Sequence, residues 1–295
     1  MSIEFRTTQR SVANTALAGL QSSLDRFQQL QQKLSSGVAI SRPSDDPVGT
    51  VSIMQVRTDQ SRADQYSRNA SDGADLLGTA DTALTTMLDD IRRLRVLAAQ
   101  GINGGQSPDA LSASAAEVES IRADLQAQAN TRYLGRPIFA GTADVTDAYD
   151  ANGSYQGDLG VAKRTVGPGT SVDVNVPGPD VFGPAGGDLF ALAQQIADDL
   201  RSNQANLPGR LDQIDTSLQS VQNQLATVGA RYNRVDTMRT LNDNRSAALG
   251  NTLADVQGVD IPHTIMDLQL QQTAYQAALG ATARVVQPTL MDFLR

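Results

Sequence analysis

Apolar residues recur at alternating intervals of three and four at both ends of this 295-residue chain. This spacing places one apolar side chain per turn on the same face of an α-helix, and it is typical of a coiled-coil seam. The two ends therefore predict long helices, one over residues 8–36 and one within residues 259–295. The N-terminal stripe consists of Leu17, Leu20, Leu24, Phe27 and Leu34, and the C-terminal stripe consists of Ile265, Leu268, Tyr275, Leu279, Val286 and Phe293.

The sequence "ISRPSDDP" at residues 40–47 follows the first predicted helix. Gly37 lies where a helix C-cap is expected, and the two prolines forbid a continuous helix through the segment. Asp46 followed by proline is a helix-start signal, with the aspartate as N-cap. The carboxylates of Asp45 and Asp46 could instead form a catalytic pair, but side chains of adjacent residues diverge, and such a pair needs two carboxylates held at a defined separation. We therefore expect a structural turn formed by Ser44, Asp45, Asp46 and Pro47.

Further helices are indicated between the two ends. An apolar stripe over 77–98 predicts one helix, Ser107 is the expected N-cap of the next, and helical patterns return after the middle of the chain. Residues 134–186, which we call the insert, are instead rich in glycine and proline. Within the insert, the segments 161–166 and 171–178 are joined by a Gly-Pro-Gly-Thr turn and predict a β-hairpin.

These patterns predict a mainly α protein. We expect a long antiparallel helical bundle or coiled-coil rod built from both chain ends, with a small β-rich domain inserted in the middle. Five segments are expected in chain order. They are an N-terminal helix (1–42), the first half of a helical rod (43–133), the insert (134–186), the second half of the rod (187–258) and a C-terminal helix (259–295).

The composition argues against several classes of function. The chain contains no cysteine and a single histidine, His263, which excludes disulfides and thiol chemistry and leaves few metal sites. The formal net charge of −8 argues against a nucleic-acid partner. No phosphate-binding glycine loop and no G-x-S-x-G nucleophile motif is present. We therefore expect no enzyme activity and no cofactor. We also expect no cleaved signal peptide and no membrane-spanning segment.

The residues leave two uses for the terminal stripes open. The two predicted helices could form a self-contained bundle, with each other and with the middle helices. They also carry apolar residues off the shared seam, which favour burial on more than one side, and two helices of one chain cannot supply that. The stripes would then be contacts between subunits. These off-seam residues are Leu30, Leu270, Leu290 and Leu294.

Two segments resemble the bacterial flagellin superfamily. They are "LSSGVAISRPSDDP" (34–47), which follows the N-terminal helix, and "QQTAYQAALGATARVVQPTLMDFL" (271–294), which is similar to the closing helix of that superfamily. Three further segments are more similar to its hook-associated branch than to filament subunits. They are "LMDFL" (290–294), "IFAGT" (138–142) and "VDVNVPGPDVFG" (172–183).

The resemblance implies a structural component of the flagellum that joins the hook to the filament. Members of the superfamily are exported unfolded without a cleaved signal peptide, act outside the cell, and bury their terminal helices between subunits. The implied partners are further copies of the chain in a ring or helical assembly, another hook-associated protein, flagellin subunits and an export chaperone.

Three alternatives remain open from the sequence. The chain could be a divergent flagellin, which would grow into a homopolymer. The insert could be an enzyme or a ligand-binding module, for example one that recognises a saccharide. The whole chain could be a self-contained coiled-coil scaffold, whose ends would resist proteases in the monomer.

Overall fold

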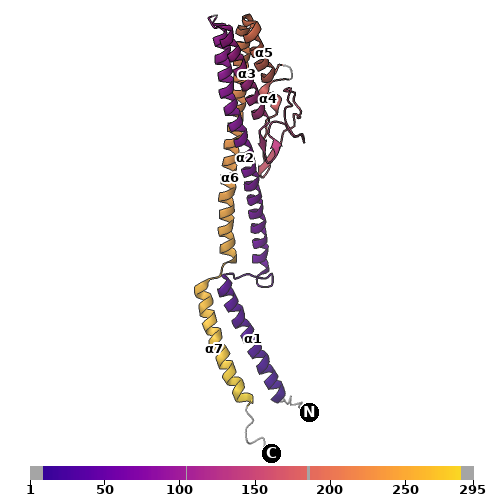
Figure 1. Ribbon diagram of the computed structural model, residues 1–295. Helices are drawn as coiled ribbons and strands as arrows, with labels where there is room; N and C mark the ends of the chain where they lie inside the picture. Colours follow the sequence, from indigo (N-terminus) through magenta and orange to yellow (C-terminus); the bar gives the residue numbers. More distant parts are fainter. Residues whose placement is uncertain (1–8, 104, 185–186, 287–295) are drawn as a thin grey trace, which may run out of the picture. The chain divides into compact units, whose positions relative to one another are not determined.

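A computed structural model describes residues 9–103, 105–184 and 187–286 (Figure 1). The helices are α1 (Gln9–Ser36), α2 (Pro47–Ile102), α3 (Pro108–Ala129), α4 (Gly178–Phe182), α5 (Leu189–Ser202), the short 3₁₀ helix η1 (Gln204–Asn206), α6 (Leu207–Gln257) and α7 (Ile261–Val286). The strands form two hairpins, β1 (Arg132–Tyr133) with β2 (Arg136–Pro137) and β3 (Lys163–Gly167) with β4 (Thr170–Asp173). The protein is therefore mainly α, as the sequence predicts.

The chain divides into two compact units. The terminal unit comprises Met1–Gln60 and Ala247–Arg295, and the middle unit comprises Ser61–Ser246. Each unit has its own packing.

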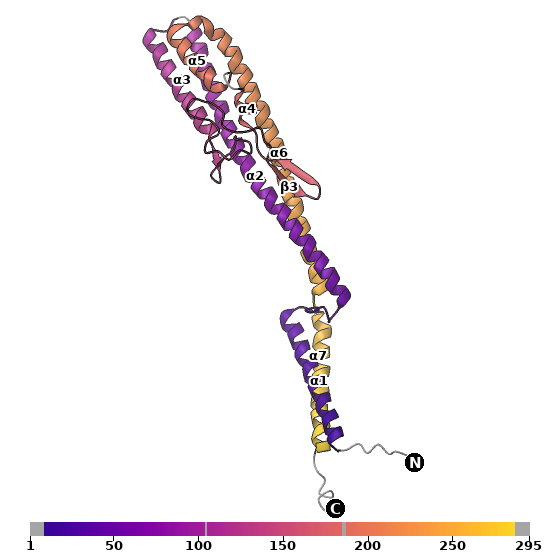
Figure 2. The ribbon, with the colours of Figure 1, turned by 90° about the vertical axis from the view of Figure 1, so that its right-hand side faces the viewer.

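In the middle unit, α2 and α6 lie side by side and run antiparallel (Figures 1 and 2). Arg95 Nε donates to Asp215 Oδ1 at 2.7 Å, and Ser246 Oγ donates to Asp64 Oδ1 at 2.6 Å. The partner number on α6 therefore rises as the residue number on α2 falls. The helix α2 buries several residues in each stretch of seven, among them Met87 and Leu94. On both helices one series of buried residues recurs at every seventh position, the repeat of a coiled coil. These residues, none more than 5% exposed, are Ala63, Ala70, Leu77, Leu84, Ile91 and Ala98 on α2 and Leu207, Ile214, Val221, Val228, Val235 and Asn242 on α6.

The helices α3 and α5 pack against each other and complete the core of the middle unit. Ser107 Oγ accepts a hydrogen bond from the backbone N–H of Ala110 at 3.3 Å, which confirms the predicted N-cap of α3. Asp188 Oδ1 caps α5 in the same way, accepting from the N–H of Ala191 at 2.8 Å. Both side chains satisfy a backbone donor that the first turn of a helix leaves unpaired.

An aromatic cluster forms the core of the insert. The chain has only six phenylalanines and six tyrosines. Five of these twelve residues meet here, with ring centroids 5.0 to 5.6 Å apart in each contacting pair. Such pairs contribute about 0.5–1.5 kcal/mol each beyond the area that they bury. The members of the cluster are Phe139, Tyr149, Tyr155, Phe182 and Phe190.

The predicted β-hairpin of the insert is confirmed, since β3 pairs antiparallel with β4. Two asparagines hold this hairpin on the long helices. Asn69 Nδ2 on α2 donates to the carbonyl of Thr165, and Asn242 Nδ2 on α6 donates to the carbonyl of Val166, both at 2.8 Å. Asn242 occupies a core position of the α6 repeat, where a polar side chain costs stability but fixes register.

Asn175 holds the loops of the insert together. Its side chain is 4% exposed. Its Nδ2 donates to the carbonyls of Gly141 at 3.1 Å and Gly160 at 3.0 Å, and its Oδ1 accepts from the N–H of Ala162 at 2.8 Å. Its own carbonyl accepts from Arg231 Nη1 on α6 at 2.9 Å. One residue therefore joins three loop segments and a helix.

Replacing Ile91 by alanine should destabilise the middle unit strongly. Ile91 is fully buried in the α2 seam, so Ile91→Ala leaves a cavity and should lower the free energy of unfolding by about 2–5 kcal/mol. Val96 lies on the same helix and is 44% exposed, so Val96→Ala should change the free energy of unfolding by less than about 0.5 kcal/mol. Urea unfolding of each full-length variant, followed by circular dichroism, measures the two changes. Equal losses would show that the seam is not the core.

Replacing Asn175 by alanine should loosen the insert. Three side-chain hydrogen bonds are lost, each worth about 0.5–1.5 kcal/mol. Asn233 on α6 is exposed, and Asn233→Ala is the matched control. Hydrogen exchange of the insert amides should accelerate in Asn175→Ala and stay unchanged in the control. Unchanged exchange in both variants would contradict the role given to Asn175.

Candidate assembly interface

The helices α1 and α7 of the terminal unit lie side by side in opposite directions (Figures 1 and 2). Gln271 Nε2 on α7 donates to the carbonyl of Ser23 on α1 at 3.0 Å and to its Oγ at 2.7 Å. Contact between the two helices covers only part of each predicted stripe. The half-buried members are Leu20, Phe27, Leu34, Leu268 and Tyr275.

The other described members of the stripes remain open to solvent. Leu17 is 55% exposed, Leu24 37%, Ile265 42% and Leu279 43%. The off-seam Leu270 is 70% exposed. In a unit of this size a contiguous core would bury such residues, but among the described residues of the terminal unit only Ile53 and Thr264 are buried. Exposed apolar surface on this scale marks an interaction site.

The last positions of the C-terminal stripe lie beyond what the structure describes. Val286 ends α7, but its side chain lies outside the described residues. Phe293, Leu290 and Leu294 lie outside them entirely.

Three exposed residues at the start of α2 were not identified from the sequence. Val48 is 77% exposed, Val51 68% and Met54 64%. Their spacing of three keeps them on one broad face of the helix. That spacing could have identified them, but the segment was interpreted only as a helix start. They enlarge the apolar surface of the terminal unit.

The turn before α2 positions this helix start. Asp46 Oδ1 accepts hydrogen bonds from the N–H groups of Val48 and Gly49, both at 3.0 Å, and α2 begins at Pro47. Ser44 lies in the exposed turn just before. The Asp46 side chain therefore serves the first turn of the helix.

Asp45 closes the other side of this turn. Its Oδ2 accepts from the N–H of Arg42 at 2.9 Å, and from the N–H and Oγ of Ser41, both at 3.1 Å. The backbone hydrogen bonds from Arg42 and Ser41 lower the pKa of the Asp45 carboxyl, so it stays ionised, the opposite of what a general acid needs. The carboxylates of Asp45 and Asp46 thus bind separate sets of donors and do not converge on one point.

Backbone hydrogen bonds join the end of α1 to the segment between α6 and α7. Gly37 ends α1 with a φ of 69°, as expected of a glycine C-cap. Its carbonyl accepts from the N–H of Val259 at 3.1 Å, and the N–H of Ala39 donates to the carbonyl of Gln257 at 2.8 Å. Within the terminal unit, these bonds set the places where α1 ends and α7 begins.

No group of three or more metal-ligating side chains comes together among the described residues. His263 pairs its Nδ1 with Asp267 Oδ2 at 3.1 Å and is largely exposed. In the part of the chain that the structure covers, every helix is too short or too polar to cross a membrane.

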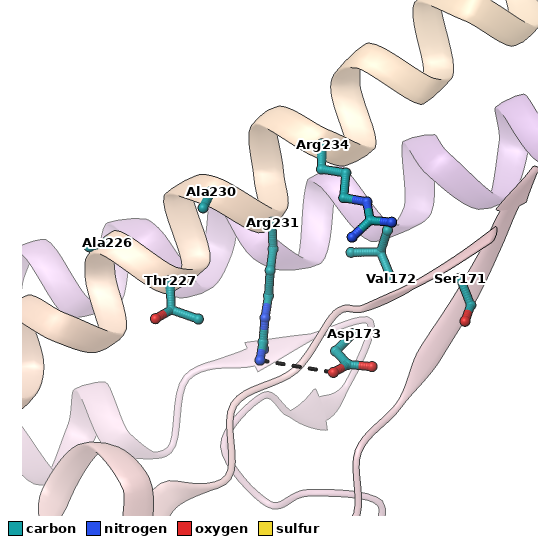
Figure 3. A pocket seen from close by; sticks show the side chains of 8 residues that line it. All are labelled: Ser171, Val172, Asp173, Ala226, Thr227, Ala230, Arg231 and Arg234. Carbon is teal, nitrogen blue, oxygen red and sulfur yellow. Dashed lines mark ion pairs between the residues drawn. The ribbon is translucent and has the colours of Figure 1, made fainter.

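A hollow of about 520 Å³ lies between β4 and α6 in the middle unit (Figure 3). Arg231 and Arg234 reach from α6 toward β4. Arg231 Nη2 lies 4.0 Å from Asp173 Oδ2, whereas no hydrogen bond or ion pair joins the side chain of Arg234 to another described residue. The hollow is lined by Ser171, Val172, Asp173, Ala226, Thr227, Ala230, Arg231 and Arg234.

Comparison with known proteins gives consistent matches. Residues 8–144 match the family model of the bacterial flagellin N-terminal helical region. Flagellin of Bacillus subtilis is 26% identical over 96% of both chains, and flagellar hook-associated protein 3 of Escherichia coli is 23% identical over 90% of this chain and 92% of that protein. A crystal structure of flagellar hook-associated protein 3 from Legionella pneumophila, 15% identical, covers 69% of this chain and 98% of its own, with a TM-score of 0.63. At that identity the structural match shows the shared fold.

The family model covers the N-terminal helices, and the two relatives align over 90% and 96% of the chain. The resemblance found in the segments at both chain ends is therefore confirmed. Residues 8–144 thus match the bacterial flagellin N-terminal family, and the chain is similar to flagellins and to flagellar hook-associated protein 3 over most of its length.

Proposed function

We propose that the chain is a structural subunit of the bacterial flagellum that joins the hook to the filament. The exposed apolar stripes of α1 and α7 carry this proposal, because a neighbouring subunit would bury them. The relatives named flagellar hook-associated protein 3 and the matching fold of such a protein support the hook-associated role. The chain acts through assembly, and its partners are further copies of itself, another hook-associated protein and flagellin.

The energy of assembly comes from completing the burial of these side chains. Full burial of one leucine or isoleucine contributes about 1.5–3 kcal/mol, and partial burial proportionally less. Several such residues on each copy supply enough to offset the ordering of the terminal helices on assembly. The segments 1–42 and 259–295 are the assembly segments in this proposal, and Ser44 to Pro47 form the turn that ends the first of them.

The same surface suggests how the chain is handled before assembly. Exposed apolar stripes promote aggregation when they are left uncovered, so an export chaperone that covers α1 or α7 fits the proposal. Export without a cleaved signal peptide would place the chain outside the cell, on the flagellum.

A divergent flagellin is the second candidate, because flagellin of Bacillus subtilis aligns over 96% of both chains. The two functions differ in what the purified chain forms. A junction protein should add a short collar to the tips of isolated hooks and should form no long filaments alone. Electron microscopy of the chain, with and without hooks, decides between them. Long filaments from the chain alone would make it a filament subunit.

Leu24→Asp and Leu279→Asp should abolish collar formation. Each places a charge on a stripe that the neighbouring subunit would cover, and burying an unpaired charge costs several kcal/mol. Both residues are at least 37% exposed in the single chain, so its thermal unfolding should change little. Leu241, 57% exposed on α6 in the middle unit, provides the control Leu241→Asp, which should still assemble. Unfolding of the whole chain by either stripe variant would contradict an assembly-specific role.

A further inference from the structure

We infer that the insert carries a second contact between copies of this chain, in which Leu134 of one copy enters the hollow between β4 and α6 of the next. This inference rests on the proposed function, since it assumes that copies lie side by side. It adds a contact in the middle unit to the stripes of the terminal unit.

Leu134 is unusual in both backbone and side chain. Its φ is 49°, and among the described residues it is the one non-glycine residue with a positive φ. Its side chain is 82% exposed. The left-handed region disfavours a leucine by about 1–2 kcal/mol, and water disfavours its side chain. Neither the positive φ nor the exposed side chain stabilises the single chain, and backbone strain of this kind concentrates at functional contacts.

The turn places this side chain at the tip of a hairpin. Leu134 and Gly135 connect β1 to β2, where Tyr133 pairs with Arg136, and Gly135 also has a positive φ, of 82°. Two successive positive φ angles in a two-residue hairpin loop define a type I′ turn, for which Asn-Gly is favoured. Leucine replaces the favoured asparagine at the tip of the hairpin. We call the exposed Leu134 side chain at this tip the knob.

The hollow between β4 and α6 offers a matching surface. Val172, Ala226 and Ala230 give the hollow an aliphatic lining. The side chain of Arg234 also lines it and has no hydrogen-bond or ion-pair partner among the described residues. Near the knob, the Asp144 side chain is 97% exposed and lies 3.5 Å from Arg136.

Charge favours this match over other contacts between copies. Copies with a net charge of −8 repel one another in general. The side chain of Arg234, which has no partner among the described residues, reduces that repulsion locally, because it places a positive charge at the hollow of an otherwise acidic neighbour.

The knob and the hollow are separate surfaces of the chain. Leu134 lines a smaller hollow formed by α2, β2 and β3, and that hollow shares no lining residue with the one between β4 and α6. A contact that joins two different surfaces is heterologous, so each copy can accept one neighbour and offer its knob to another. Such contacts generate rings or helical arrays, as the proposed function requires.

Engineered cysteines test the contact directly, because the natural chain has none. Leu134→Cys and Ala230→Cys, combined in one chain, should form disulfides between copies when collars assemble on isolated hooks under mild oxidation. Both positions are exposed, so folding should be retained. Non-reducing electrophoresis should show a ladder of covalent oligomers. The mismatched control combines Leu134→Cys with Val96→Cys and should give no ladder.

The outcomes separate this inference from the proposed function. Collars without a ladder overturn the inference alone. Absence of collars from the wild-type chain overturns the proposed function, and absence of a ladder at high chain concentration then overturns the inference as well. A dimer from Leu134→Cys alone would show a symmetric contact and would also overturn it.

Leu134→Asn tests the strain argument. Asparagine suits the left-handed backbone, so the melting temperature of the single chain should stay constant or rise. The fraction of hooks that carry a collar should fall, because the apolar knob is lost. A lower melting temperature would show that Leu134 stabilises its own chain, and an unchanged collar fraction would show that it makes no contact.

Discussion

The seam between α2 and α6 governs the middle unit. Both helices carry a series of buried residues at every seventh position, and alanine, valine and isoleucine outnumber leucine in it by eight to three, which allows close and regular packing. The surfaces on either side of this seam hold α3, α5 and the insert. Asn69 and Asn242, one from each long helix, donate to consecutive carbonyls of β3, so the position of the hairpin depends on the register of the seam.

Among its described residues, the terminal unit has no such core. The pair α1 and α7 is linked by Gln271 and Ser23 and by partial burial of its stripes, while residues such as Leu270 remain in contact with water. A coiled coil of two helices can cover one seam on each, and these helices carry apolar residues beyond one seam. The single chain therefore leaves apolar side chains of α1 and α7 exposed to water. That property is a defect in a monomer and a requirement in a subunit of an assembly.

The segment from Asp45 to Pro47 shows how easily chemistry can be read into a sequence. Adjacent aspartates between two prolines could suggest a catalytic loop. In the structure, the Asp46 carboxylate caps α2, and the Asp45 carboxylate accepts from Arg42 and Ser41. Hydrogen bonds to the charged form lower the pKa of the Asp45 carboxyl and keep it ionised. Both side chains bind backbone N–H groups and so stabilise the turn.

The sequence by itself determined the mainly α fold, the N-cap at Ser107, the hairpin of the insert and the superfamily. These follow from local periodicity, capping and turn residues, and short motifs, which act over a few neighbouring positions. Only the tertiary structure decided that Leu20 and Phe27 are half-buried while Leu17 stays exposed, because burial depends on the partner helix. The aromatic cluster around Tyr149 and the strained Leu134 also required it. The cluster joins residues far apart in the chain, and the strain at Leu134 arises because leucine occupies a turn position that favours asparagine, so the residue pattern alone does not predict that turn.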